Sequence, residues 1–415
     1  MTIFNKINLQ LFATQTTDQL SLSAEMKTFY DMTLLDNAQA NLVHDQFGQK
    51  KPIPKNGGKT IEFRKFAPLN KALTPLTEGV TPAGNSLSVS TITASVAQYG
   101  DYIKQSDVLE LTALDNTILE ATKLLGQQAG LTLDTITRNV LNSGTNVNYA
   151  SKWSGGTEVP VTSRKDLDNT AVLKVDTVRQ IVAKLKSLNA PKINGDYIAI
   201  IHPFVEYDLM SDKEWKDPKT YCDPKDLYEG EIGKIAGVRF VETSEAKIFG
   251  PGEIFGGYER LTVSKAISSS STSVEVSEEA PATLTNISIP CYINGVKNEI
   301  TAIVPGERKT TLTVKTAITS LNVGAIVCGQ NALPDGSAIF STLFIAQGAY
   351  GVTEVTGGGL ETIVKQKGSG GTEDPLDQRS SVAWKAIKTA EILNGDYIVR
   401  VESVSPRYSA TANSN

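Results

Sequence analysis

The chain has 415 residues, enough for a buried core and two or three domains, and its 40% hydrophobic and 20% charged residues are ordinary for a soluble protein. The formal net charge of −5 predicts no general attraction to nucleic acid or to an anionic membrane, and no run approaches the roughly 20 apolar residues of a membrane span. The three cysteines, Cys222, Cys291 and Cys328, form no CxxC pair. We expect each to be a reduced, buried residue that packs like a small hydrophobic side chain in a reducing cytosol.

The N-terminal residues are predicted to form an extended arm followed by a hinge. The stretch MTIFNKINLQLFATQ is interrupted by Asn8 and Gln10, so a signal peptide is not expected and residues 1–25 are interpreted as an arm that docks on another surface. Apolar residues within 25–47 suggest a helical or mixed segment. The hinge is the Pro-, Gly- and Lys-rich stretch 50–59.

A long hairpin is predicted between Lys59 and Lys104. The run KTIEFRKF alternates, with Ile61, Phe63 and Lys65 on one face, and a tip rich in Pro and Gly follows it. The period-two run SLSVSTITASVAQYGDYI is predicted to be the second strand. Because a lone two-stranded ribbon is only marginally stable in water, we expect the hairpin to lie on something outside its own domain.

The strongest predicted helix follows the hairpin, from about 115 to 143. Its apolar residues recur at spacings of three or four and form one stripe: Ile118, Ala121, Leu125, Ala129, Leu133, Ile136 and Val140. Asp115 and Glu120 near its start and Arg138 near its end suit the helix dipole, and Gly144 supplies a stop.

A compact mixed domain is predicted after a polar loop at 145–170. Asp176 to Leu188 has helical spacing, with Val178, Ile181, Val182, Leu185 and Leu188 facing inward. A buried strand follows within 194–203, then a short helix, FVEYDLMSD, and another strand around 238–241.

The texture changes at Val263, where a stretch rich in Ser and Thr introduces several β-like runs. The runs between 283 and 328 are separated by turn residues such as Asn294-Gly295 and Pro305-Gly306, which predicts a small all-β module over 263–337. The flanking runs RLTV and IFSTLFIAQ are interpreted as neighbouring strands that a single turn could join. The last residues, 409–415, are expected to be disordered.

The search for catalytic chemistry finds little. The two histidines, His44 and His202, have no motif around them, and His202 is interpreted as a core or turn histidine rather than a ligand. The glycine-rich stretch 250–257 lacks the Lys-Ser/Thr ending of a phosphate-binding loop, so it is interpreted as a turn. A long arm beside a long helix, without a catalytic site, suggests a protein that functions by contacting copies of itself.

The order of these elements resembles a tailed-phage major capsid protein of the Hong Kong ninety-seven type. The stretches that sharpen this resemblance towards the coat-protein subfamily named after phage N-four are NLQLFAT, PKNGGKTIEFRKF, LTEGVTPAGNSLSVSTITASVAQYGDYIKQSDVLELT, GVRFVETSEAK, DPLDQRSSVAWKA and ILNGDYIVRVES. The resemblance covers residues 1–262 and 338–408, and its specificity lies in the order of the motifs.

The resemblance implies an α+β phage major-capsid fold with a peripheral domain on a spine helix, an axial domain, an extended loop that overlies a neighbouring subunit and an N-terminal arm. It implies the following division: arm and hinge 1–58, extended loop 59–104, peripheral domain 105–189 and 361–408, axial domain 190–262 and 338–360, and an inserted β-rich domain 263–337 that departs from the family pattern.

The resemblance also implies intersubunit contacts by residues of the extended loop: Arg64, Lys65, Lys71, Leu76, Glu78, Asp101 and Lys104. The expected core of the spine helix is Ile118, Leu125, Ala129, Leu133, Ile136 and Val140. Some relatives crosslink a loop lysine to an asparagine of the next subunit, but no feature here identifies a partner for Lys71. No catalytic residue, metal ligand or cofactor is expected.

The implied function is that of a major capsid protein that assembles into hexamers and pentamers of a DNA-filled phage head. The implied partners are portal and scaffolding proteins, a decoration protein and packaged double-stranded DNA bound without sequence specificity, with no membrane. The implied location is the virion, after assembly in the host cytoplasm. Two alternatives stay open: a nanocompartment shell of the same fold, and a monomeric surface or carbohydrate-binding β protein. An enzyme is the weakest hypothesis.

Overall fold

The structure is a computed structural model of the whole chain. It describes residues 34, 42–52, 59–66, 69, 71–73, 75–76, 78–79, 81, 84–108, 117–215, 233–331, 333–353, 360–365, 376 and 378–415. The expected N-terminal arm, most of the segment 25–47 and Cys222 lie outside these residues.

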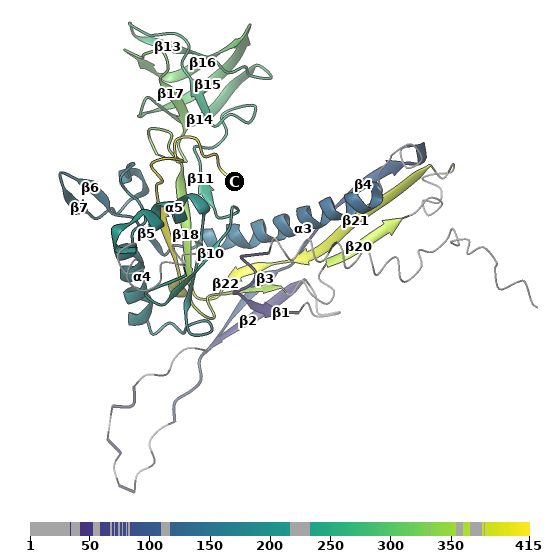
Figure 1. The fold of residues 1–415 in the computed structure, drawn as a ribbon, viewed down its shortest axis with the longest axis vertical. Coiled ribbons are helices and arrows are strands. Elements are labelled where there is room, and N and C mark those ends of the chain that lie inside the picture. Colours follow the sequence, from purple (N-terminus) through teal and green to yellow (C-terminus); the bar gives the residue numbers. More distant parts are fainter. Residues whose placement is uncertain are drawn as a thin grey trace, which may run out of the picture.

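A mixed seven-stranded sheet forms the centre of the fold (Figure 1). Its path is β5 (Val147–Tyr149), β23 (Ile398–Ser403), β18 (Ile339–Ile345), β8 (Tyr197–Ile201), β10 (Val238–Glu242) and β9 (Lys234–Ile235), and β11 (Ile248–Phe249) pairs with β18. β8 is apolar and buried at every position because both faces of the sheet are covered. α4 (Val175–Ser187) and α5 (Pro203–Ser211) pack on one face, and Leu141, Tyr350 and Val352 pack on the other.

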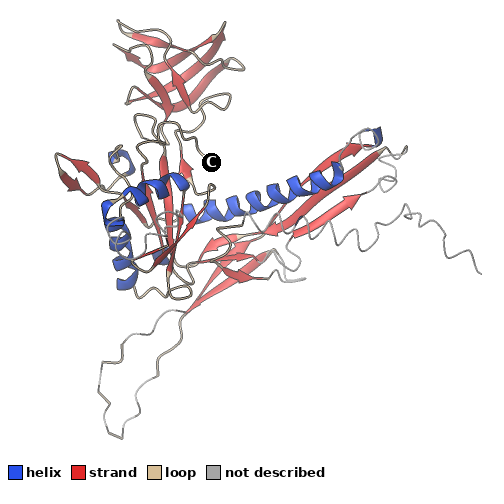
Figure 2. Ribbon diagram, viewed as in Figure 1, coloured by secondary structure: helices blue, strands red, loops and turns tan. Residues whose placement is uncertain are grey.

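The predicted long helix is α3, Thr117–Asn142, and it lies along a three-stranded antiparallel sheet (Figure 2). The sheet has the order β20 (Leu360–Lys365), β21 (Arg379–Lys388) and β4 (Ala97–Ser106). Alternate residues of β21, among them Val382, Trp384 and Ala386, pack against Leu125, Ala129 and Leu133 of the helix. Leu34 and Leu42 complete this core.

The predicted hairpin exists, but its second strand is shorter than expected. β2 (Thr60–Phe66) pairs with β3 (Val89–Ser95), and Ile61 and Phe63 are buried as the alternation predicts. The run that was expected to be one strand is two, because the chain leaves β3 at Val96 and continues as β4, which pairs with β21. The hairpin and its tip reach away from the rest of the chain (Figure 1).

A small sheet anchors the base of the hairpin. It consists of β1 (Gln49–Lys51), β19 (Tyr350–Thr353) and β22 (Ala390–Ile392). A Cβ at Gly351 would lie 2.3 Å from the ring of Phe63, so the glycine allows the hairpin to approach β19 closely.

Two local predictions after α3 are wrong. The expected loop at 145–170 contains β5, the short hairpin of β6 (Lys152–Ser154) and β7 (Thr157–Val159), and a 3-10 helix at Arg164–Asp166. Gly155 and Gly156 have φ of 61° and 84° and form the turn of that hairpin, which is too short to show a period in the sequence. Leu188 is 41% exposed because α4 ends at Ser187, whereas the other four predicted inward residues are buried.

The predicted all-β module is a closed six-stranded barrel. Its strands are β12 (Arg260–Thr262), β17 (Ile326–Gly329), β14 (Leu284–Ile293), β15 (Val296–Gly306), β16 (Lys309–Ile318) and β13 (Ser271–Val276), in that order. Val263, the residue after β12, pairs with Val276, the last residue of β13, and Ser264 N donates to Glu275 O at 2.9 Å, which closes the sheet on itself. The barrel has its own apolar core, which includes Cys291; Cys328 is also buried, and both cysteines are free.

The barrel begins earlier than the sequence predicts. β12, the expected axial strand RLTV, pairs with β17 inside the barrel, and Ile254 and Phe255 belong to the barrel core. The strand that neighbours β18 is instead β11, and Phe249 lies directly opposite Ile339. Residues 250–338 are therefore an insertion between the two paired antiparallel strands β11 and β18.

This pairing predicts that the barrel can be removed without unfolding the rest of the chain. Replacing residues 250–338 by Asn-Gly would leave β11 and β18 as a hairpin with a two-residue turn, which suits adjacent antiparallel strands. We expect the shortened protein to be soluble and to unfold cooperatively on heating. Its far-ultraviolet circular dichroism should be that of the helices and strands outside the barrel. The excised segment 250–338 should also fold when expressed separately. An insoluble shortened protein would show that the barrel contributes to the main core.

The C-terminal residues are ordered, contrary to the prediction. Tyr408 stacks on Phe204 with ring centroids 4.0 Å apart, Ala338 N donates to Ser409 O at 2.7 Å, and Asn415 Nδ2 donates to Ala246 O at 2.9 Å. Small polar residues favour disorder only where the rest of the fold offers them no partners, and here it supplies several.

Candidate intersubunit surfaces and the buried junction beneath them

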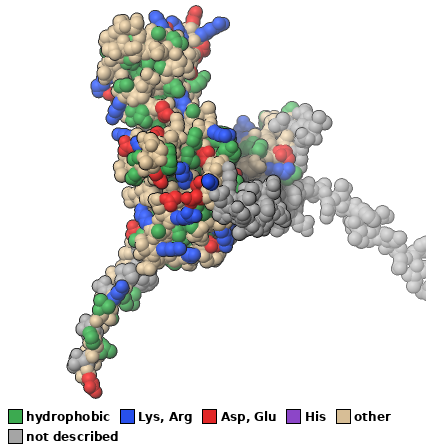
Figure 3. Space-filling view, turned by 60° about the vertical axis from the view of Figure 1, so that its left-hand side comes forward, with side chains coloured by type: hydrophobic (Ala, Val, Ile, Leu, Met, Phe, Trp, Pro, Cys, Tyr) green, Lys and Arg blue, Asp and Glu red, His purple; other side chains and the backbone are tan. Residues whose placement is uncertain are grey.

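The hairpin carries exposed apolar side chains. Leu69, Leu73, Leu76, Leu87 and Val89 are between 46% and 82% exposed in the single chain. Figure 3 shows apolar side chains along the hairpin where it extends from the body. Such a run of exposed leucines is typical of a surface that another chain covers.

The charged residues predicted on this loop also lie at the surface. Arg64, Lys71 and Glu78 are exposed, and Leu76 among the leucines was predicted as a contact. The side chain of Lys65 lies outside the described residues.

The three-stranded sheet presents its other face away from α3. In one register, Ile363, Ala383 and Tyr102 lie side by side on this face, and Tyr102 is 55% exposed. Lys104 Nζ lies 5.2 Å from the Tyr102 ring centroid, and Lys385 Nζ lies 2.9 Å from Glu361 Oε2. With Lys365 also exposed, this outer face combines an apolar row with an excess of lysine.

Asp101, which was predicted as an intersubunit contact, does not share that face. It lies opposite Trp384 on the side of the sheet that faces α3, where Gln128 Nε2 donates to its carboxylate at 2.6 Å. That hydrogen bond and the one from Tyr102 N lower the pKa of Asp101. Trp384 Nε1 also donates to Gln128 at 3.2 Å, so Gln128 links the sheet to the helix.

The predicted core residues of α3 differ in burial. Leu125, Ala129 and Leu133 are buried, whereas Ile118, Ile136 and Val140 are only half-buried. The last two turns bury polar side chains instead: Asp134, Thr137, Arg138 and Asn142.

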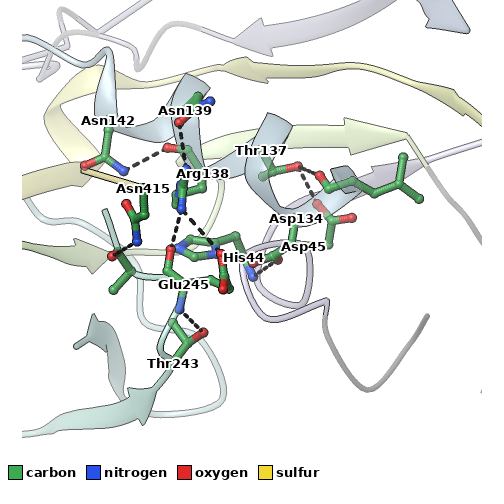
Figure 4. Close-up of polar contacts among 12 residues, drawn as sticks. His44, Asp45, Asp134, Thr137, Arg138, Asn139, Asn142, Thr243, Glu245 and Asn415 are labelled. Atoms are coloured by element: carbon green, nitrogen blue, oxygen red, sulfur yellow. Dashed lines mark hydrogen bonds and ion pairs between the residues drawn. The ribbon is translucent and has the colours of Figure 1, made fainter. Parts of the chain in front are cut away.

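A buried network joins this polar end of α3 to the segment before the hairpin (Figure 4). His44 N and His44 Nδ1 both lie 2.7 Å from carboxylate oxygens of Asp134. Thr137 Oγ1 donates to Asp45 Oδ1 at 2.6 Å, and Lys388 Nζ pairs with Asp45 Oδ2. Tyr350 Oη donates to His44 O. The segment is thereby tied to α3, β19 and β21.

Arg138 ties the same helix to the central sheet. Its Nη1 donates to Glu245 O at 3.0 Å and lies 3.6 Å from the Glu245 carboxylate (Figure 4). Burial lowers the pKa of Arg138, and Glu245 and Asp134 offset that effect. Asn142 accepts from Ser341 Oγ of β18 at 2.6 Å. Asp134 and Arg138, four residues apart and each close in the sequence to residues of the apolar stripe, were the available indication of a buried polar cluster.

His202 caps α5, as a turn histidine would. Its Nδ1 accepts from Phe204 N at 3.2 Å. Burial lowers the pKa of His202 to about 4, which keeps the ring neutral and able to accept that hydrogen bond. Within the described ranges, no group of three or more His, Cys, Asp or Glu side chains could hold a metal ion.

A second titrating group on α5 yields a prediction. Burial raises the pKa of Glu206 to about 7, and repulsion from Glu242 and a hydrogen bond that the protonated Glu206 carboxyl donates to Glu242 add to this effect. The unfolded chain has an ordinary pKa near 4.3, so this group stabilises the fold below that pH and loses its contribution as pH rises through about 7. His202 has the opposite sign, because its contribution is present above about 6.5 and is lost as pH falls towards 4.

We therefore expect the free energy of unfolding of Glu206→Gln, measured relative to that of the wild type, to increase by about 2 kcal/mol when the pH is raised from 5 to 8. Urea unfolding of both proteins at the two pH values measures this difference. Both proteins contain His202, so its contribution to the pH dependence cancels in the comparison. The control is the exposed Glu158→Gln, which should show a constant difference. A pH-independent difference for Glu206→Gln would contradict the raised pKa of Glu206.

Comparison with known proteins finds a family model that resembles part of the chain. Residues 89–275 match the family model described as phage capsid protein. The matched region contains the second hairpin strand, α3 and most of the central sheet before the barrel. No curated protein matches the chain.

Solved phage capsids share the fold. The capsid of cyanophage P-SCSP1u has 13% sequence identity and a TM-score of 0.51, with 89% of this chain and 87% of that chain covered. The capsid of Ralstonia phage GP4 has 11% identity and a TM-score of 0.50, with 87% and 86% covered. The chain has the α+β fold of phage capsid proteins, as predicted. In the part of the chain that the structure describes, no helix is long and apolar enough to cross a membrane.

Proposed function

We propose that the chain is the major capsid protein of a tailed double-stranded DNA bacteriophage and assembles into the hexamers and pentamers of an icosahedral head. The family match carries this proposal, and the capsid fold supports it. Both give less support to a nanocompartment shell, which would contain a cargo enzyme instead of DNA. A monomeric carbohydrate-binding protein would have no need for the exposed leucines of the hairpin.

The finer identity is part of the same proposal. The order of motifs supports the Hong Kong ninety-seven type and the subfamily of phage N-four. We propose a structural, non-enzymatic role in the virion, with assembly in the host cytoplasm alongside portal and scaffolding proteins. The enclosed DNA is held without sequence specificity, and the net charge of −5 gives the chain no general attraction to it.

In domain terms, α3 with β20, β21 and β4 forms the peripheral domain, the central sheet forms the axial domain, and β2 and β3 form the extended loop. The barrel stands on the outer surface of the shell, because a DNA-filled interior leaves little room for it. Its preferred partner is a neighbouring subunit, then a decoration protein, then the host surface.

The hairpin tip binds the outer face of the three-stranded sheet in a neighbouring subunit. The tip offers leucines and the carboxylate of Glu78, and the sheet offers the apolar row of Ile363 and Tyr102 beside Lys104 and Lys365. The two surfaces are complementary in both apolarity and charge, which favours association of the correct faces.

The experiment is negative-stain microscopy and light scattering of the purified protein over a range of salt, concentration and scaffold. We expect closed shells for the wild type and few or none for Lys104→Glu, with partial recovery when Glu78→Lys is added. Lys186→Glu, on the exposed face of α4, is the charge-matched control and should assemble normally. A wild-type protein that stays monomeric under every condition would contradict the proposed function. Shells that form equally well with Lys104→Glu would contradict only the proposed contact between the hairpin tip and the outer face of the sheet.

A further inference from the structure

The neck of the barrel contains three chain segments instead of the two that its insertion requires. Residues 250–259 lead from β11 into the barrel, and residues 330–338 lead back to β18. These two segments touch each other where Asn331 N donates to Pro251 O at 3.3 Å. The C-terminal segment 405–415 runs beside them, as the figure shows near the mark for the C-terminus (Figure 1).

Arg260, at the start of β12, joins all three segments. Its Nε donates to Gly336 O at 2.8 Å in the returning segment. Its Nη2 donates to Ala412 O at 2.7 Å and to Ser409 O at 3.3 Å, and its Nη1 donates to Asn413 Oδ1 at 3.0 Å. One guanidinium therefore uses all three of its nitrogens to hold the neck and the C-terminal segment together.

The end of the segment is bound on the other side of the neck. Ser414 N donates to the Glu259 carboxylate at 3.0 Å, and Ser414 Oγ also contacts that carboxylate. Ile248 N donates to Asn415 Oδ1 at 2.9 Å, and Lys247 Nζ contacts Asn415 O. Gly250 makes room for this arrangement, because a Cβ there would lie 2.4 Å from Glu259 Oε2 and 2.5 Å from Ser414 N.

The beginning of the segment is fixed to the axial side. The Tyr408 ring stacks on Phe204 of α5, and Ser409 O accepts from Ala338 N. Ser405 and Ser409 are buried. The segment is thus anchored on the axial side and at β11, and Arg260 of the barrel is held between these anchors.

We propose that residues 410–415 are a strap that fixes the orientation of the barrel on the axial side of the molecule. Without the strap, the barrel depends on two connecting segments that contain Gly252 and Gly336, whose positive φ of 89° and 81° marks tight turns. The barrel would then tilt while both it and the central sheet stay folded. The strap converts an appended domain into a rigid one.

Three variants of the full chain release the strap in different ways. Truncation after Ser409 removes it, Arg260→Gln removes the central donor, and Gly250→Ala places a methyl group between Glu259 and Ser414. Arg308→Gln, at an exposed turn of the same barrel, is the control for the arginine. Gly395→Ala is the control for the glycine, because no atom lies within 4 Å of the added Cβ.

Hydrogen exchange is measured on the unassembled subunit, so the result does not depend on the proposed function. We expect amide exchange in segments 246–259 and 330–338 to rise about tenfold or more in the three variants, with β15, β16 and β8 unchanged. Fluorophores attached at Ser270 in the barrel and Lys186 on α4, both exposed, should show a broader distribution of distances. Unchanged neck exchange and an unchanged distribution would overturn the proposal. Equal acceleration in the barrel strands and in β8 would also overturn it, because the segment would then be a general part of the core.

Discussion

Leu133→Asp should prevent soluble folding of the subunit. Leu133 is fully buried where α3 packs on β21, in the same apolar cluster as Leu125 and Trp384. The substitution loses roughly 2–3 kcal/mol of apolar burial and adds an unpaired carboxylate whose desolvation costs several kcal/mol more. The sum approaches the whole stability of an ordinary domain, about 5–15 kcal/mol.

The next residue shows what a buried carboxylate needs in this helix. Asp134 is equally buried, but it accepts from two nitrogens of His44. A carboxylate at 133 would face hydrocarbon. The measurement is the soluble fraction after expression, together with helical circular dichroism. Leu124→Asp is the matched control and should fold, because Leu124 lies on the same helix and is 59% exposed. A soluble Leu133→Asp protein with wild-type helicity would show that this face is not packed in solution.

Replacing Leu69, Leu73, Leu76 and Leu87 together by Ser should abolish shell formation while leaving the subunit folded. The four side chains are 61–82% exposed in the single chain, so the change removes little from the folded subunit. In an assembled contact each buried leucine would contribute about 1.5–3 kcal/mol, so four would contribute several kcal/mol for every neighbouring pair. A loss of that size at every contact lowers association by orders of magnitude.

The control for this change is Leu188→Ser, at an apolar residue that is 41% exposed just after the end of α4. Light scattering and electron microscopy report assembly, and thermal unfolding reports subunit stability. We expect the loop variant to keep the wild-type melting temperature of the unassembled subunit and to form no shells. Normal shells from the loop variant would exclude the hairpin tip as an apolar contact.

The elements of this fold that could be predicted are those whose pattern is local. The spacing of Leu125, Ala129 and Leu133 predicts α3 because one helix face carries the whole signal. The alternation of Ile61 and Phe63 predicts β2 for the same reason. These patterns required no knowledge of the partner segment.

The features that the sequence did not predict depend on distant partners. The polar turns of α3 are buried because His44, Asp45 and Lys388 meet them from segments far away in the chain. The break at Val96 arises because β21, nearly three hundred residues later, takes β4 as its neighbour. The C-terminal residues are ordered because distant residues, among them Phe204, Glu259 and Arg260, contact them. In each case the deciding residue lies outside any local window.

The closure of the barrel has a consequence for crowding. A curved shell would hold many copies of this module at a very high local concentration, a condition under which open strand edges recruit one another into continuous sheets. In the barrel, the pairing of Val263 with Val276 engages the two strands that would otherwise be edges. Neighbouring barrels can therefore meet through side chains but not by adding strands. A surface crowded with β modules can in this way stay a lattice of discrete units instead of fusing into fibrils.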